Sequence, residues 1–469
     1  MGKILAGYLM PHPPIILKEI GRGKEKEIQN TIDGMEEIAK DIKEKMPKTI
    51  ILITPHGPVF SDAIAISIKS QLEGNMAGFG AEQVKMIKDN DLEIANRIIR
   101  YSNKRNIPCA MVDDEFAKEY NISTELDHGT MVPLYFVDKE YIHYRLIPIT
   151  YGLLSNEDLY SFGKSIQEAV EEGEEDVVII ASGDLSHKLK EEGPYGYNSA
   201  GEEYDRLIMD LIESLDVEKI INIDRNLCEE AGECGMRSID IMLGSCDGYE
   251  VSSEVISYEG PFGVGYGVAK FEIHNRDGKR QLLDKLYKTR KDKMLEIKGK
   301  EDEYVKLARQ SLENYIKNGN VIEIPKEISS QLIKEKKGVF VSIKKDGALR
   351  GCIGTIEATT ENVAREIIKN AIKAGAEDPR FFPVEEEELE YLTYSVDVLM
   401  SPEPIKSFQD LDVNKYGIIV SLNERRGLLL PNLKGVDSVE EQIRIALGKA
   451  GIAANEGYNI QRFEVIRHN

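Results

Sequence analysis

Short apolar runs alternate with amphipathic stretches along the first 270 residues or so of the chain. Four near-continuous apolar runs occupy residues 3–10, 49–54, 144–150 and 177–182. Runs of this kind are typical of strands that are buried on both faces of a sheet. Residues 28–46 and 159–173 instead have apolar positions at helical spacing. The alternation predicts an α/β domain with a central, at least partly parallel sheet covered by helices, and residues 260–273 are its predicted closing strand.

The pattern changes after residue 275. Residues 276–300 contain ten Lys or Arg against four acidic residues, a net charge of +6, with a weak helical stripe of apolar positions. We interpret residues 276–301 as a basic helical linker with a solvated surface, and docking of an acidic partner is the alternative. The predicted domains are therefore residues 1–275 and residues 302–469.

The second domain has the pattern of an α+β fold. An amphipathic helix is predicted at residues 305–319 and another at 361–376. Residues 337–356 predict a hairpin with its turn at Lys345, Asp346 and Gly347. A strand at residues 391–400 and a strand pair around Gly427 complete the predicted elements.

Composition and charge narrow the class of protein. The 469 residues suggest two or three domains at ~150 residues each, and 41% hydrophobic and 30% charged residues are typical of a globular chain. No apolar run approaches the ~18 residues of a membrane helix, and prolines interrupt the apolar start, so we expect no signal peptide and a cytoplasmic location. Five scattered cysteines without a C-x-x-C pair suit a reducing compartment. A net charge of −22 argues against nucleic acid as a partner.

Four of the seven histidines occupy comparable places in the first domain. His12, in MPHPP, and His56, in TPHGP, each follow a predicted strand directly. His187 ends SGDLSH after the strand at 177–182, and His128 precedes an apolar run in LDHGTMVPLYF. The loops after parallel strands form the crevice where open α/β sheets bind ligands. Imidazole is the commonest metal ligand and the usual acid–base group near neutral pH, so the pattern indicates one shared site.

The four motifs, in this order and spacing, resemble the LigB-like family, the catalytic subunits of class III extradiol dioxygenases, and the related Memo-like proteins. The resemblance covers about residues 1–275. It implies that His12 and His56 bind Fe(II), that His187 is the acid–base residue, and that His128 lines the pocket and hydrogen-bonds the substrate or bound oxygen. Asp184, three residues before His187, is close enough in a turn to orient that imidazole, or it caps the following helix.

The third metal ligand stays open between two neighbouring residues. Glu233 suits the carboxylate of the dioxygenases, whereas Cys234 aligns with a cysteine of the Memo-like proteins. Neighbours on a helix point ~100° apart, so both are not expected to bind one ion. A carboxylate favours oxygen-activating iron, and a thiolate opens the site to copper or zinc. Glu254 and Glu259 are weaker alternatives that strand-edge charge also explains.

Residues 302–469 resemble the AMMECR family, most specifically in ALRGCIGTI at residues 348–356. Cys352 is a candidate nucleophile or a buried structural thiol, and Arg350 would bind an anionic group or pair with an acid at residues 385–388. The fused architecture resembles two components of the AmmeMemoRadiSam set, which implies a radical SAM partner. The chain lacks the C-x₃-C-x₂-C motif of such a protein.

Three functions follow from this reading. The leading hypothesis is a non-haem iron oxygenase that cleaves a catechol-type ring with O₂, or a derivative of one. The second is a metal-binding or redox partner of the radical SAM protein that lacks ring cleavage. The third is a zinc hydrolase that uses a metal-bound water.

Overall fold

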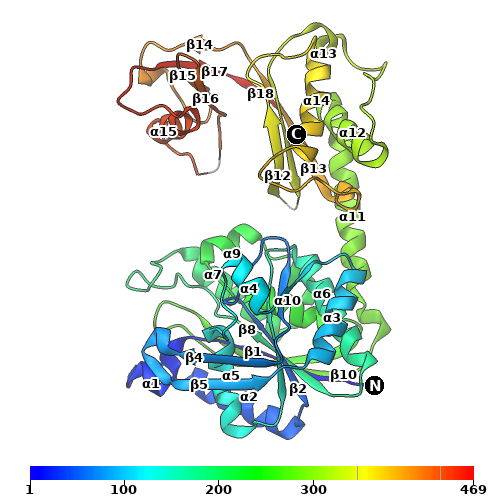
Figure 1. Cartoon of the computed structure of the whole chain (residues 1–469). Helices are drawn as coiled ribbons and strands as arrows, with labels where there is room; N and C mark the ends of the chain where they lie inside the picture. The colour runs from blue at the N-terminus through cyan, green and yellow to red at the C-terminus, as the bar shows by residue number, and fades with distance from the viewer. Residues whose placement is uncertain (346, 434) are drawn as a thin grey trace. The chain divides into compact units, whose positions relative to one another are not determined.

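The computed structural model describes residues 1–345, 347–433 and 435–469 in two compact units, Met1–Tyr287 and Lys288–Asn469 (Figure 1). The predicted turn residue Asp346 lies outside the described residues. Each unit has its own sheets and its own apolar cores. The helix α11 (Leu282–Lys300) occupies most of the predicted linker, and the division between the units falls within it.

An eight-stranded sheet forms the centre of the N-terminal unit, in the order β6-β3-β7-β2-β8-β1-β10-β9. Its strands are β1 (Ile4–Met10), β2 (Thr49–Thr54), β3 (Ile64–Ser67), β6 (Cys109–Val112), β7 (Arg145–Thr150), β8 (Val177–Ser182), β9 (Tyr249–Glu259) and β10 (Tyr266–Arg276). The central strands β7, β2, β8 and β1 pair in parallel, whereas β10 pairs antiparallel with both β1 and β9. The prediction of an at least partly parallel sheet is confirmed, and antiparallel strands lie toward the edges of the sheet.

Both faces of this sheet are buried, as the apolar runs require. In β2, Ile51 and Ile53 belong to one apolar cluster, and Ile50 and Leu52 belong to another. Successive side chains of a strand point to opposite faces, so the two clusters are the two cores of the layered unit. Helices cover both faces of the sheet (Figure 1).

The helices of the N-terminal unit lie between and after the strands. They are α1 (Lys18–Gly21), α2 (Gln29–Lys45), α3 (Leu92–Lys104), α4 (Asp114–Tyr120), α5 (His128–Glu140), α6 (Asn156–Glu172), α7 (Ser199–Glu213), α8 (Val217–Ile221), α9 (Arg225–Ala231) and α10 (Met236–Ser245). A separate hairpin is formed by β4 (Gln71–Met76) and β5 (Ala81–Asp89), with a short 3₁₀ turn, η3 (Ala77–Phe79), at its tip. The helices α2 and α5 supply side chains to one core, and α3, α6 and α10 supply side chains to the other.

The C-terminal unit combines two antiparallel sheets with helices, which confirms the predicted α+β class. Its strands are β11 (Val339–Lys345), β12 (Ala348–Gly354), β13 (Leu392–Leu399), β14 (Glu403–Pro404), β15 (Gly417–Leu422), β16 (Arg425–Leu429), β17 (Asn459–Phe463) and β18 (Val465–His468). They form the sheets β12-β11-β13-β18 and β14-β17-β15-β16. The helices are α12 (Glu303–Asn318), α13 (Ser330–Lys334), α14 (Val363–Ala376) and α15 (Val439–Ala450).

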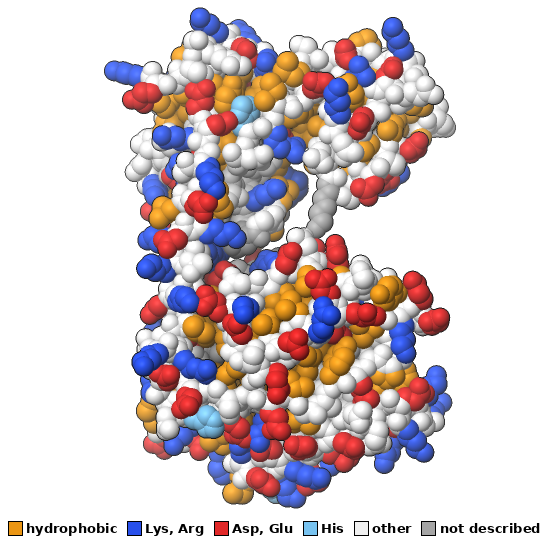
Figure 2. Space-filling view, turned by 180° about the vertical axis from the view of Figure 1, so that it is seen from behind, with side chains coloured by type: hydrophobic (Ala, Val, Ile, Leu, Met, Phe, Trp, Pro, Cys, Tyr) orange, Lys and Arg blue, Asp and Glu red, His pale blue; other side chains and the backbone are white. Residues whose placement is uncertain are grey.

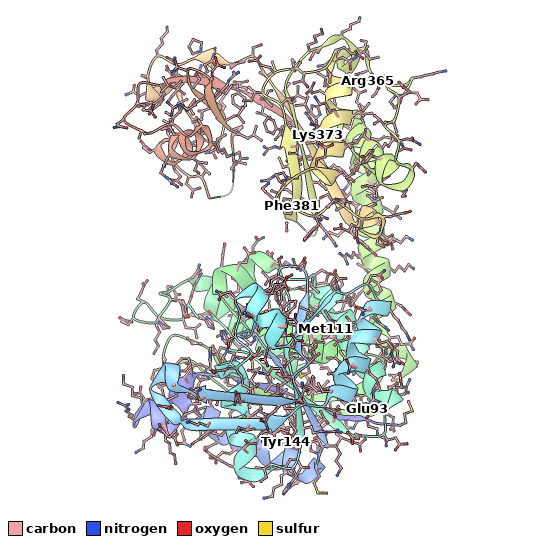
Figure 3. All side chains as sticks on the ribbon, in the orientation of Figure 1. Glu93, Met111, Tyr144, Arg365, Lys373 and Phe381 are labelled. Carbon is pink, nitrogen blue, oxygen red and sulfur yellow. The ribbon has the colours of Figure 1, made fainter. Side chains whose placement is uncertain are left out.

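The surface carries charges of both signs, spread over the face of the N-terminal unit that Figure 2 shows. Strand β6 is an edge strand, and its Met111 keeps 49% of its surface exposed (Figure 3). Among the described residues, the helices are all too short or too polar to cross a membrane.

Candidate metal centre

His12 lies two residues after the end of β1 and is held by the end of the neighbouring strand β8. The backbone N–H of His12 donates to Asp184 at 2.8 Å, and its Nδ1 lies 2.8 Å from the Ser182 hydroxyl. That hydroxyl donates its proton to the carbonyl of Gly129, so its oxygen accepts from His12 Nδ1–H. The contact fixes the tautomer and leaves His12 Nε2 unprotonated, as a metal ligand needs.

His56 and His128 are brought together by Asp127, the residue before the α5 helix. The Asp127 carboxylate caps α5 by accepting from the N–H of Thr130, and it also accepts from the Thr54 hydroxyl at 2.6 Å. Thr54 in turn accepts from the N–H of His56 at 3.2 Å. The start of α5 is thereby tied to the end of β2, and the His56 and His128 rings stack with centroids 4.1 Å apart.

A glycine makes this approach possible. A Cβ at Gly129 would lie 2.5 Å from Thr54 Oγ1 and 2.8 Å from Asp127 Oδ1. Such contacts are far inside van der Waals distance, so a side chain at this position would force the start of α5 away from the end of β2.

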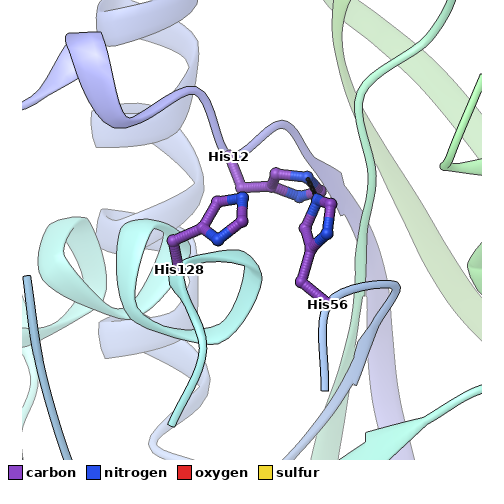
Figure 4. A group of neighbouring side chains, drawn as sticks. All are labelled: His12, His56 and His128. Carbon is purple, nitrogen blue, oxygen red and sulfur yellow. Dashed lines mark hydrogen bonds between the residues drawn. The ribbon is translucent and has the colours of Figure 1, made fainter. Parts of the chain in front are cut away.

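The three imidazoles form a group that fits one metal ion (Figure 4). One nitrogen from each of His12, His56 and His128 lies within 4.8 Å of the others, and the Nε2 atoms of His12 and His56 are 3.0 Å apart. Two nitrogens bound to one ion at ~2.0–2.1 Å lie ~2.8–3.4 Å apart for angles of ~90–109°. The 3.0 Å spacing of the His12 and His56 nitrogens and the neutral nitrogen donors therefore suit a transition metal.

The electrostatics keep these imidazoles uncharged. Burial, and then repulsion from His56, lowers the pKa of His12 well below its usual value. The same two causes lower the pKa of His128 to about 4, with Asp127 opposing them. Loss of hydration also lowers the pKa of His56. Metal binding requires the neutral imidazole, so near neutral pH no proton has to leave a protonated ring before binding.

The structure places the thiol of Cys234 next to His12. The Cys234 thiol lies 3.7 Å from His12 Nε2 and accepts from the N–H of Asp184 at 3.3 Å. Glu233 instead accepts from the N–H of Met236, at the start of α10, at 2.7 Å. Burial raises the pKa of the Cys234 thiol well above its usual value, so a metal would have to displace its proton. The ligand role of either residue stays a prediction.

His187 lies close enough to the cluster to interact electrostatically with His56. Burial and this repulsion lower the pKa of His187 to about 4. Its ring stacks on Tyr195 with centroids 5.1 Å apart. The carboxylate of Asp184, which the sequence suggested would orient His187 or cap a helix, instead accepts from the backbone of His12, because the turn after β8 directs it back toward the end of β1. Burial raises the pKa of Asp184 to about 7.

The weaker carboxylate candidates do not belong to the histidine group that the described residues form. Glu259 accepts from both the N–H and the hydroxyl of Thr31, at 2.7 Å, and so ties β9 to α2. Glu254 is exposed on β9, beside β10. These positions fit the structural explanation given for both residues.

The two candidates in the C-terminal unit have internal partners. Arg350 makes a bidentate ion pair with Glu388, which is the alternative given for it. Cys352 lies half-buried in β12, where the Ser342 hydroxyl donates to its sulfur and its own N–H donates to Asp378. These contacts are consistent with a structural role and do not test the nucleophile hypothesis.

Asp127 and Ser182 are among the residues that position the site but were not singled out from the sequence. Asp127 could have been found, because an Asp just before an apolar helical run is a helix N-cap signal. Ser182 carries no such signal, since its role depends on the parallel pairing of β8 with β1. That pairing is not visible in the sequence.

The fold and these side chains define an α/β protein with an imidazole-lined candidate metal centre at the ends of parallel strands. Residues 6–269 match the family described as the catalytic LigB subunit of aromatic ring-opening dioxygenase, and residues 305–468 match AMMECR1. The first match covers more than half of the chain, so the chain belongs to the LigB family, which is generally metal-dependent, with an AMMECR1 region after it.

The relatives match nearly the whole chain or about a third of it. A protein of Clostridium acetobutylicum is 48% identical over 462 residues, which covers 98% of each chain. A Thermotoga maritima protein is 49% identical over 170 residues, or 36% of this chain and 98% of its own. The solved structure of an uncharacterized Pyrococcus horikoshii protein is 34% identical, covers 35% of this chain and 88% of its own, and has a TM-score of 0.33.

Proposed function

We propose that the N-terminal unit binds one transition-metal ion and acts on a small aromatic diol with O₂, as an extradiol-dioxygenase-like enzyme. The observation that carries the proposal is the grouping of His12, His56 and His128, whose nitrogens lie within 4.8 Å of one another. Metal sites with three protein ligands leave coordination positions open and are typical of catalysis. Fe(II) at such a site would provide one centre at which both a diol and O₂ can bind.

The surrounding residues have distinct parts in this proposal. Ser182 and Asp184 hold the ring and the backbone of His12, and Asp127 holds the start of α5. His187, neutral near pH 7, is available to accept a phenolic proton of the substrate, the acid–base role that the family resemblance implies. In this arrangement His128 is a candidate ligand as well as a pocket residue.

The position of Cys234 favours a second candidate function. Its thiol lies 3.7 Å from His12 Nε2, whereas the Glu233 carboxylate is engaged at the start of α10. A thiolate beside imidazoles suits copper or zinc better than oxygen-activating iron. The second candidate is therefore a metal-binding redox protein without ring cleavage, acting in the cytoplasm with a radical SAM partner. Co-purification of such a protein from the host tests the partner.

Metal loading and oxygen uptake separate the two candidates. The full chain is loaded anaerobically with Fe(II), Cu(II) or Zn(II) and its bound metal is measured. Oxygen consumption with a panel of catechols and Fe(II)-loaded protein supports ring cleavage, and tight copper binding without oxygen consumption supports the second candidate. Full metal occupancy in the His12→Ala/His56→Ala double variant would contradict both.

The acid–base role of His187 has a test of its own. His187→Ala should keep its metal and lose roughly 10²- to 10⁴-fold in ring-cleavage rate, the usual contribution of such a group. His12→Ala should lose both metal and activity. Loss of metal from the His187→Ala variant would place His187 among the ligands instead.

A further inference from the structure

Two exposed aromatic rings contact histidines of the candidate site, one the candidate ligand His128 and the other the candidate acid–base residue His187. Phe79 keeps 44% of its surface exposed and meets the His128 ring edge to face, with centroids 5.1 Å apart. Tyr195 keeps 62% of its surface exposed and stacks on His187. Exposing a large aromatic surface to water costs free energy. A contiguous patch of such surface commonly marks a binding site.

Phe79 ends η3, the short turn between β4 and β5, the two strands of a hairpin that Figure 1 shows. A Cβ at Gly74 in β4 would lie 2.8 Å from Leu126, so the hairpin packs closely on the segment that leads into α5. The N–H of Leu126 donates to the carbonyl of Glu73 at 2.8 Å. These contacts place η3, at the tip of the hairpin, next to His128. The exposed side of the Phe79 ring makes no contribution to the packing of the hairpin.

Tyr195 belongs to a loop that closes on itself after His187. The N–H of Asn198 donates to the carbonyl of Lys188 at 2.9 Å, and Leu189 pairs with Tyr197 as a β-bridge. These two contacts close the base of the loop. Tyr195 lies in the turn of this loop, and its ring stacks on the ring of His187. The two aromatic rings thus come from separate segments and contact two different histidines.

We propose that Phe79 and Tyr195 are specificity-determining residues that select a planar aromatic ring over a non-aromatic diol. The inference rests on the proposed function, because it names the substrate feature that the same site recognises. Aromatic rings prefer offset or edge-to-face contacts with centroids 4.5–7 Å apart, the kind of contact that both rings already make with histidines. Their exposed surfaces are available for a further ring of a bound substrate.

Binding to the zinc-loaded full chain tests the proposal without turnover. The probes are 4-nitrocatechol, followed by its absorbance under anaerobic conditions, and the non-aromatic cis-1,2-cyclohexanediol, followed by calorimetry. Phe79→Leu and Tyr195→Leu keep apolar bulk and remove the aromatic ring, whereas Phe79→Tyr and Tyr195→Phe keep it. Phe408→Leu, at a ring that is 60% exposed in the C-terminal unit, is the matched control.

Each Leu variant should bind 4-nitrocatechol roughly 2- to 12-fold more weakly, the range that one aromatic contact contributes. Bound zinc, affinity for the cyclohexanediol, and binding by the aromatic and Phe408→Leu variants should stay unchanged. Equal weakening for both probes, or no weakening, would overturn the specificity role and leave the proposed function standing. A wild-type chain that binds zinc but not 4-nitrocatechol would overturn both the aromatic substrate and this inference. A wild-type chain that binds no metal would overturn the proposed function itself.

Discussion

Replacement of Asp127 tests whether the metal centre depends on the contact between α5 and the end of β2. Its carboxylate caps α5 and accepts from the Thr54 hydroxyl at 2.6 Å, while Thr54 accepts from the N–H of His56. Asp127→Ala removes the cap and this link together. His56 and His128 would then lose their common anchor, although neither imidazole is itself changed.

The magnitude follows from the contacts that are lost. Loss of an N-cap costs about 0.5–2 kcal/mol of stability, and loss of a hydrogen bond to a charged group costs about 1.5–3 kcal/mol. Removing a residue that orients metal ligands typically lowers metal affinity by roughly 10- to 100-fold. We therefore expect the metal affinity of Asp127→Ala to be roughly 10- to 100-fold lower than that of the wild type. The variant should also unfold at a lower denaturant concentration.

Competition with a chromogenic chelator measures the affinity, and urea unfolding of the metal-free chain measures the stability. Asp127→Asn is the matched control, because Asn caps helices about as well as Asp and keeps an acceptor for Thr54. This variant should recover most of the lost stability and affinity. Unchanged metal affinity in Asp127→Ala would show that the histidines are held without this link, and the reasoning would fail.

Three further predictions concern other parts of the chain. The metal-free chain should lose stability as the pH falls from about 6.5 toward 4. In the folded chain the pKa of both His128 and His187 is lowered to about 4, so over this range the histidines of the unfolded chain take up protons first. Urea unfolding midpoints that do not change over this pH range would contradict the prediction. Gly129→Ala should weaken metal binding in the same chelator assay, since its Cβ would lie 2.5 Å from Thr54 Oγ1. If this variant binds metal as tightly as the wild type, α5 can shift without any effect on metal binding. Limited trypsin digestion should cut first within residues 276–300, and early fragments from cuts elsewhere would argue against an accessible linker there.

The fold class followed from the sequence because burial leaves a strong local signal. The strand β2, Thr49–Thr54, is apolar at successive positions and is buried on both faces of the sheet, as its run of residues predicted. The antiparallel pairing of β10 with β1 carried no comparable signal, since an apolar run does not report its direction relative to a neighbour.

The candidate site was only partly predictable for a related reason. His12 and His56 could be placed together because each follows a buried strand, and the ends of parallel strands meet at one edge. The choice between Glu233 and Cys234 could not be made, because it depends on how the segment before α10 turns. A Cβ at Gly183 would lie 2.2 Å from Gly235, and this close backbone approach, which brings Cys234 beside His12, is a tertiary feature.

The residues of the candidate site come from distant parts of the chain, which affects when the protein could acquire a metal. His12 and its partner Ser182 are 170 residues apart in the chain, and Cys234 is 222 residues from His12. Closing such long loops is a late event in folding, so an unfolded or half-synthesised chain offers no preformed site. Metal should therefore be captured by the folded unit after synthesis. Bound metal would then stabilise only the complete fold, with a gain that grows with the free metal concentration in the cell.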